Sequence, residues 1–149
     1  MSVEQKITEE RKKEPIVAFC CNHSGFEAYE RACRELAFED SALRVVRMPC
    51  SGKVDIPHIL YAFENGAYGV LVFACYKDNC KYIHGNVRAE KRIADVKGIL
   101  QEIGIQPERV EFKEVASNTP YRIKNAVEQM RERLSQLGSL NLERNNNRL

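Results

Sequence analysis

Four short apolar runs, separated by helical patterns, constrain the fold of this chain more than any other feature of the sequence. The runs cover Ile16–Cys21, Leu43–Met48, Gly69–Cys75 and Val110–Ala116. The first and third are apolar almost throughout, which is typical of strands in a parallel sheet with both faces covered.

Helical patterns follow each run, over Gly25–Phe38, Pro57–Asn65, Asn86–Ile103 and a last segment from Thr119–Pro120 to Gly138. Within the last segment, Ile123, Val127, Met130, Leu134 and Leu137 recur at helical spacing. This alternation predicts an α/β fold, namely a single Rossmann or flavodoxin-like domain. We expect a four-stranded parallel sheet of order 2-1-3-4 with helices on both faces.

The chain has 149 residues, which is enough for one domain with its own core. We expect a polar N-terminal arm over residues 1–14, the α/β domain over residues 15–138 and a mobile C-terminal tail over residues 139–149. A net charge of +2 gives no reason to expect a nucleic-acid partner. The longest apolar run, Val70–Cys75, is too short to span a membrane, and the N-terminal residues lack the apolar core of a secretory signal. We therefore expect a cytoplasmic protein.

Five of the six cysteines lie at or just after the ends of predicted strands. In a reducing cytoplasm, clustered thiols indicate metal or redox chemistry more often than structural disulfides. Cys20 and Cys21 end the first run, Cys50 follows the second, Cys75 ends the third, and Cys80 lies in the next loop. In the order 2-1-3-4 these three strands are neighbours, so their carboxyl ends bring the thiols to one edge of the sheet.

Two cysteines have a different expected place. Cys20 and Cys21 are consecutive, and neighbouring side chains on a strand point to opposite faces, so only one of them is expected at this edge. Cys33 lies in the first helical pattern, on a stripe with Tyr29, Ala32 and Leu36. We expect Cys33 to be a buried hydrophobic residue.

Four converging thiols are compatible with three kinds of site. An iron–sulfur cluster of the 2Fe–2S or 4Fe–4S type uses four thiolates, and Cys75-x4-Cys80 matches one spacing element of plant-type ferredoxins. A structural zinc site uses the same ligands, usually in two close pairs. The third alternative is a small cysteine-dependent thiol-redox or phosphatase-like enzyme that uses Cys75, with Lys81 where a phosphatase has arginine. The cluster is favoured, and the other two stay open.

Several neighbours bear on this site. Six cations lie from Cys75 to Lys97, namely Lys77, Lys81, Arg88, Lys91, Arg92 and Lys97. Their positive charge would stabilise a reduced cluster and attract an acidic partner. Alternatively, these residues form an ordinary solvated face of a helix. We expect His23 and His84 beside the cluster or at the surface rather than as ligands, and Gly52 and Gly85 in tight turns. No GxGxxG motif follows the first strand, so nothing supports a dinucleotide site.

The sequence also resembles a known family. The matching segments are Val17–Asn22, Arg44–Asp55, Gly69–Val72, Cys75-x4-Cys80, Tyr82, Gly85–Asn86, Ala89–Arg92 and Gly104–Val110. Over about residues 15–137 the chain resembles the delta-subunit family of methyl-viologen-reducing hydrogenase. The resemblance implies a non-catalytic 2Fe–2S electron-transfer subunit. It would relay single electrons from a hydrogenase, formate dehydrogenase or similar module to the flavin-bearing subunit of heterodisulfide reductase, in an electron-bifurcating complex.

One position departs from the family pattern. Family members usually have C-N-W-C after the first strand, whereas this chain has Cys21–Asn22–His23–Ser24. The resemblance then implies Cys21, Cys50, Cys75 and Cys80 as the four cluster ligands. It leaves Cys20 as a neighbour that is not a ligand.

Overall fold

The computed structural model describes residues 2–5, 14–76 and 84–140. Its four strands are β1 (Ile16–Cys21), β2 (Leu43–Met48), β3 (Gly69–Ala74) and β4 (Val110–Glu114). All pairings are parallel, in the order β2-β1-β3-β4. The predicted α/β fold class and strand order are therefore confirmed. The limits of the arm and the tail stay predictions.

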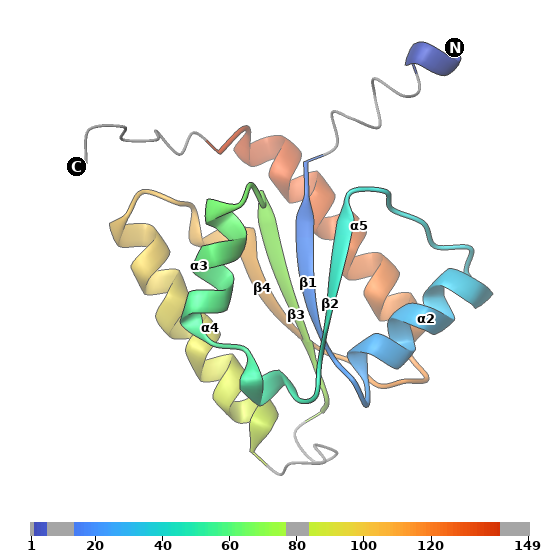
Figure 1. Cartoon of the computed structure of the whole chain (residues 1–149), viewed down its shortest axis with the longest axis horizontal. Coiled ribbons are helices and arrows are strands. Elements are labelled where there is room, and N and C mark those ends of the chain that lie inside the picture. The colour runs from blue at the N-terminus through green and yellow to red at the C-terminus, as the bar shows by residue number, and fades with distance from the viewer. Residues whose placement is uncertain (1, 6–13, 77–83, 141–149) are drawn as a thin grey trace.

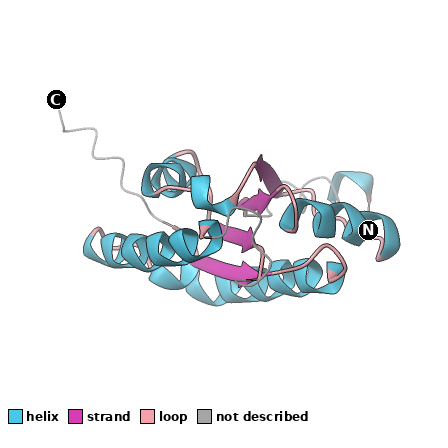
Figure 2. Ribbon diagram, turned by 90° about the horizontal axis from the view of Figure 1, so that it is seen from below, coloured by secondary structure: helices cyan, strands magenta, loops and turns pink. Residues whose placement is uncertain are grey.

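Helices cover both faces of the sheet, as predicted. They are α2 (Gly25–Glu35), α3 (Ile56–Glu64), α4 (Gly85–Glu102) and α5 (Pro120–Leu137), with short 3-10 turns η1 (Ser51–Lys53) and η3 (Pro107–Arg109). Helices α2 and α5 lie on one face, and α3 and α4 on the other, which gives three layers (Figures 1 and 2). No helix within the described ranges is long and apolar enough to cross a membrane.

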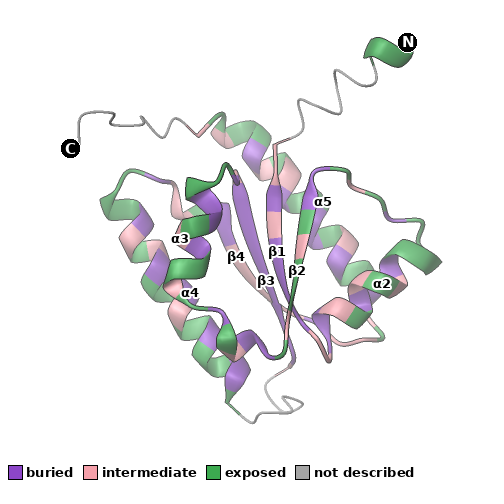
Figure 3. Cartoon of the chain, in the orientation of Figure 1, coloured by how far each residue is buried: buried purple, intermediate pink, exposed green. Residues whose placement is uncertain are grey.

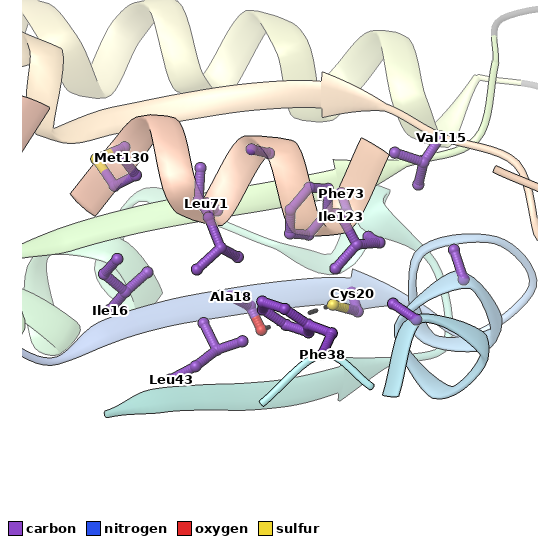
Figure 4. Close-up of a cluster of buried hydrophobic side chains, with 14 of the residues drawn as sticks. Ile16, Ala18, Cys20, Phe38, Leu43, Leu71, Phe73, Val115, Ile123 and Met130 are labelled. Atoms are coloured by element: carbon purple, nitrogen blue, oxygen red, sulfur yellow. Dashed lines mark hydrogen bonds between the residues drawn. The ribbon is translucent and has the colours of Figure 1, made fainter. Parts of the chain in front are cut away.

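The sequence of strand β3 is apolar throughout because every one of its residues is buried (Figure 3). Leu71 and Phe73 pack with α2 and α5, in the cluster shown in Figure 4. Val70 and Val72 pack with α3 and α4 on the opposite face. Each face of the central strand thus contributes to a separate half of the core.

The prediction that Cys33 is buried is wrong, because its side chain is exposed. Helix α2 lies so close to the sheet that it buries only Gly25, Ala28 and Ala32. A Cβ atom added to Gly25 would lie 2.7 Å from the Cβ atom of Phe73. The narrow contact leaves Cys33 on the solvent side of the helix.

The helix ends also differ in detail from the expected ones. Helix α2 stops at Glu35, before the expected Phe38, and Ala37 has a positive φ of 50°. Thr119 occupies the expected N-cap position of α5 but does not cap it, because its hydroxyl accepts from the Ala116 N–H at 3.0 Å and donates to the Ala116 carbonyl at 2.9 Å. Gly138 ends α5 as expected, with a φ of 76°.

A buried arginine that the sequence patterns did not reveal holds the amino edge of the sheet together. Arg109 is 0% exposed. It donates to the Tyr68 carbonyl at 3.1 Å, to the Gly138 carbonyl at 2.7 Å and to the Gln106 side chain at 2.7 Å. The Tyr68 N–H in turn donates to the Pro15 carbonyl at 2.8 Å. One guanidinium thereby links the segments that precede β3 and follow α5.

Candidate functional site

Three strand ends bring cysteines to the carboxyl edge of the sheet. Cys21 is the last residue of β1, Cys75 directly follows β3, and Cys50 comes two residues after β2. The Sγ atoms of Cys21 and Cys75 are 3.6 Å apart. All three side chains are buried, and none of them forms a disulfide. Cys80, the fourth expected ligand, lies outside the described residues, as do Lys77 and Lys81.

The pleat of β1 separates Cys20 from this edge. Cys20 packs with Phe38 and Phe73 in the core on the α2 and α5 side, and its thiol points to the Ala18 carbonyl at 3.9 Å (Figure 4). Burial, together with the charge of Cys21, raises the pKa of Cys20 to about 12. A metal ligand must be a thiolate, whereas Cys20 has the surroundings of a neutral core thiol.

Cys21 has the opposite surroundings. The Cys75 thiol donates to its sulfur, and the backbone N–H groups of His23 and Ser51 do so as well. The Ser24 hydroxyl also lies close enough to lower the pKa of Cys21, although it makes no hydrogen bond of standard geometry. Together these donors outweigh burial and lower the pKa of Cys21 to about 5. Cys21 is therefore a thiolate at neutral pH, which is the form that binds metal.

This thiolate should be visible in the cluster-free protein. Because the pKa of Cys21 is lowered to about 5, the ultraviolet absorbance of thiolate should fall as pH is lowered through that value. The free unfolded thiol titrates near pH 8.5, so the stabilisation from ionised Cys21 is present above that pH and declines as pH falls toward the folded value. A Cys21→Ser variant should lack the acidic step. A single step near the ordinary thiol value in both proteins would contradict this prediction.

The turn after β2 is shaped to face two sulfurs at once. Cys50 has extended backbone and precedes η1, and its Sγ accepts from the Gly52 N–H at 3.4 Å. The preceding N–H, of Ser51, donates to Cys21. Successive N–H groups that point to one side of a turn form a concave site for negative charge. The turn thus stabilises thiolates contributed by two different strands.

Helix α4 begins directly on this turn. A Cβ atom added to Gly52 would lie 2.8 Å from the Cα atom of Gly85, the first residue of α4. Gly52 lies in the 3-10 turn η1, as predicted, whereas Gly85 is the first residue of α4 and not part of a turn. Neither glycine has a positive φ. Glycine is needed there because the two backbones approach closely.

Two polar residues of α4 fix the cysteine segments, and sequence patterns did not single them out for this role. Asn86 is 1% exposed, and its Nδ2 donates to the Cys75 carbonyl at 3.1 Å. Arg92 donates to the carbonyls of Gly52 and, at 2.9 Å, Val54. Arg92 thus holds the turn after Cys50 in place through these hydrogen bonds. It is not simply a solvated residue or a positive charge for docking a partner. A polar residue directly after the glycine that begins the helix was the available signal for Asn86.

Within the described part of the chain, no histidine joins the cysteines in a group of three that could hold a metal ion. His23 contributes its backbone N–H to Cys21, and its side chain is half-buried. His84 is exposed at the start of α4, where it makes no side-chain cap. His58 forms a capping box with Asp55 at the start of α3.

The Cys21–Cys75 pair fits a shared metal ion. Two thiolates with bonds of about 2.3 Å to one tetrahedral metal lie about 3.8 Å apart, close to the separation in the structure. Among the described side chains no three metal-ligating groups converge, and Cys21 and Cys75 lie close enough for one metal ion to bind both. Tetrahedral sulfur ligation is common to zinc and iron–sulfur sites.

Comparison with known proteins identifies the family. A model of the family described as methyl-viologen-reducing hydrogenase, delta subunit, matches residues 16–138, from β1 to the end of α5. The chain belongs to this family. The delta-subunit resemblance noted in the sequence is thereby confirmed.

Relatives of this delta-subunit chain fall into two kinds. An iron-sulfur subunit of the vhu F420-non-reducing hydrogenase from Methanopyrus kandleri is 42% identical over 84% of this chain and 95% of its own length. The protein of the same name from Methanocaldococcus jannaschii is 36% identical over 83% and 92%. A subunit of the Ferredoxin:CoB-CoM heterodisulfide reductase of Methanosarcina mazei is 32% identical over 86% of this chain, which corresponds to only 16% of that larger protein.

Proposed function

We propose that this chain holds one 2Fe–2S cluster through Cys21, Cys50, Cys75 and Cys80 and relays single electrons. The donor would be a hydrogenase, formate dehydrogenase or similar module, and the acceptor the flavin-bearing subunit of a heterodisulfide reductase-type, electron-bifurcating complex. The observation that carries the proposal is the buried Cys21–Cys75 pair, with sulfurs 3.6 Å apart and N–H donors aimed at Cys21.

The chain's own residues prepare this site. Cys21 and Cys75 are close enough to bind one metal centre together, and with Cys50 and Cys80 they would supply the four thiolates of the cluster. The N–H groups of the Cys50 turn stabilise negative charge, and Asn86 and Arg92 hold the two ligand segments in place. When bound, the cluster supplies one-electron chemistry.

The relatives support the relay role. Those that match over nearly their whole length are named iron-sulfur subunits of a hydrogenase. A similar segment forms part of a heterodisulfide reductase polypeptide in Methanosarcina mazei, which supports a place for this chain within such an assembly. A 2Fe–2S centre takes one electron at a time, so two-electron reactions belong to the partners.

One observation also favours a second candidate, a thiol-redox protein. Two buried thiols at 3.6 Å, one of them a thiolate, are also the starting point of a reversible disulfide. The phosphatase-like version of this alternative depends on Lys81, which lies outside the described residues. A colourless, metal-free protein with a reversible Cys21–Cys75 disulfide would favour this candidate.

Metal analysis tests the proposal directly. Protein purified without oxygen is expected to contain about two irons and two sulfides per chain, to absorb visible light and to give an electron paramagnetic resonance signal when reduced by one electron. The Cys33→Ala variant, changed at an exposed position of α2, should give the same result. Stoichiometric zinc without visible absorbance would instead show a structural metal site.

A further inference from the structure

Two buried serine residues, Ser24 and Ser51, lie beside the cysteines. Ser24 is 4% exposed and Ser51 is 2% exposed, and neither Oγ atom has a hydrogen-bond partner within the described part of the chain. Native proteins seldom leave a buried hydroxyl unpaired, because the group has lost its water without replacement. Within the described residues, neither hydroxyl finds the partner that a buried hydroxyl normally has.

The position of Ser24 makes its unpaired hydroxyl more informative. Ser24 is the N-cap residue of α2, where a serine side chain normally accepts from the first turn of the helix. Here it makes no such bond. Replacing the hydroxyl would thus remove no helix cap, so capping does not explain the serine.

Both residues adjoin the same sulfur from different elements. Ser24 follows β1 and its hydroxyl lies near Cys21, whereas Ser51 begins η1 and its N–H donates to Cys21. The two serines come from loops after two neighbouring strands, β1 and β2. They flank the thiol pair whose partner group is the proposed cluster.

We infer that Ser24 and Ser51 donate O–H···S hydrogen bonds to the bound cluster or its thiolates and thereby raise its reduction potential. This inference rests on the proposed function, since it requires a cluster. The reduced cluster carries one more negative charge than the oxidised cluster, so donors to its sulfurs stabilise the reduced form more. The serines are positioning residues that tune the cluster, while four cysteines hold it.

The test measures potentials of full-length protein purified without oxygen and reconstituted with iron and sulfide. Ser24→Ala and Ser51→Ala should each keep the cluster and make its potential more negative. We expect a change of about tenfold in the ratio of reduced to oxidised cluster at fixed ambient potential, or about 59 mV for one electron. The double variant should shift further. The control is Ser135→Ala, whose exposed hydroxyl donates to the Glu132 carbonyl in α5 and whose potential should stay that of the wild type.

A second readout separates tuning from a structural role. Without cluster, the Ser51→Ala protein should melt at the same temperature as the wild type or higher, because it loses a buried hydroxyl that has no partner among the described residues. A lower melting temperature would show that the Ser51 hydroxyl stabilises the fold and would overturn the inference.

The remaining outcomes are also decisive. A wild type without iron and sulfide would overturn the proposed function and this inference together. Clusters with unchanged potentials in both alanine variants would overturn the inference alone. Loss of the cluster from a folded Ser24→Ala protein would make Ser24 an oxygen ligand instead of a donor, and would likewise overturn it.

Discussion

The Cys75→Ala protein is expected to fold, to contain no cluster and to stop electron flow between its partners completely. The substitution removes one of four proposed ligands and also the thiol that donates to Cys21. The fold should survive, because Cys75 belongs to neither of the two buried clusters that form the core. Cys21→Ala, Cys50→Ala and Cys80→Ala are expected to lose the cluster in the same way.

The measurement is a reconstituted complex of the donor module, this chain and the heterodisulfide reductase. With Cys75→Ala, each partner should keep its own activity toward artificial dyes, while transfer from the donor to the reductase flavin stops. Cys20→Ala is the matched control, since Cys20 is equally buried but faces the core. It should keep both cluster and transfer. Transfer at the normal rate with Cys75→Ala would leave a scaffolding role as the better interpretation.

The second large effect is expected on stability, from Arg109→Ala. The guanidinium is buried and donates to three acceptors, so its removal takes away these hydrogen bonds and opens a cavity. We expect the free energy of unfolding to fall by about 3–5 kcal/mol. For a domain of this size the melting temperature should then fall by roughly 10 °C.

Two further variants interpret that measurement. Arg109→Lys keeps the charge but not the planar fork that reaches separate acceptors, so it should recover only a small part of the loss. Arg34→Ala, changed at an exposed position of α2, should cost less than about 1 kcal/mol. Equal stability of Arg109→Ala and Arg34→Ala would show that the buried contacts are dispensable.

The sheet followed from sequence because its signal is local. Apolar runs such as Gly69–Ala74 mark buried strands, and the chirality of crossovers leaves few possible orders. The buried face of α2 did not follow, because it depends on how closely the helix approaches Phe73. A periodic stripe indicates which residues share a helix face but not how wide a face the neighbour covers. Cys33 was misplaced for that reason.

The candidate site likewise has features that sequence could predict and features that it could not. The convergence of cysteines at one edge follows from strand ends, and the pleat accounts for one thiol of the Cys20–Cys21 pair lying in the core. The supporting groups do not follow from local patterns. Asn86 reaches Cys75 across 11 positions of sequence, and Arg92 reaches Gly52 across 40. Such long-range polar contacts leave no periodic trace in a single sequence.

The amino edge of the sheet has a consequence for how this domain is used in larger proteins. Pro15, which leads into β1, and Gly138, which follows α5, are both tied to Tyr68, the second of them through Arg109. The polypeptide thus enters and leaves the fold on the side opposite the thiols (Figure 1). Joining further polypeptide on that side would leave the cysteine edge exposed. Domains whose two ends lie close together tolerate insertion into longer chains.

The Methanosarcina mazei reductase polypeptide is an example of such an extension, because a similar segment makes up 16% of one longer chain there. A covalent tether keeps the module at high effective concentration beside its neighbour.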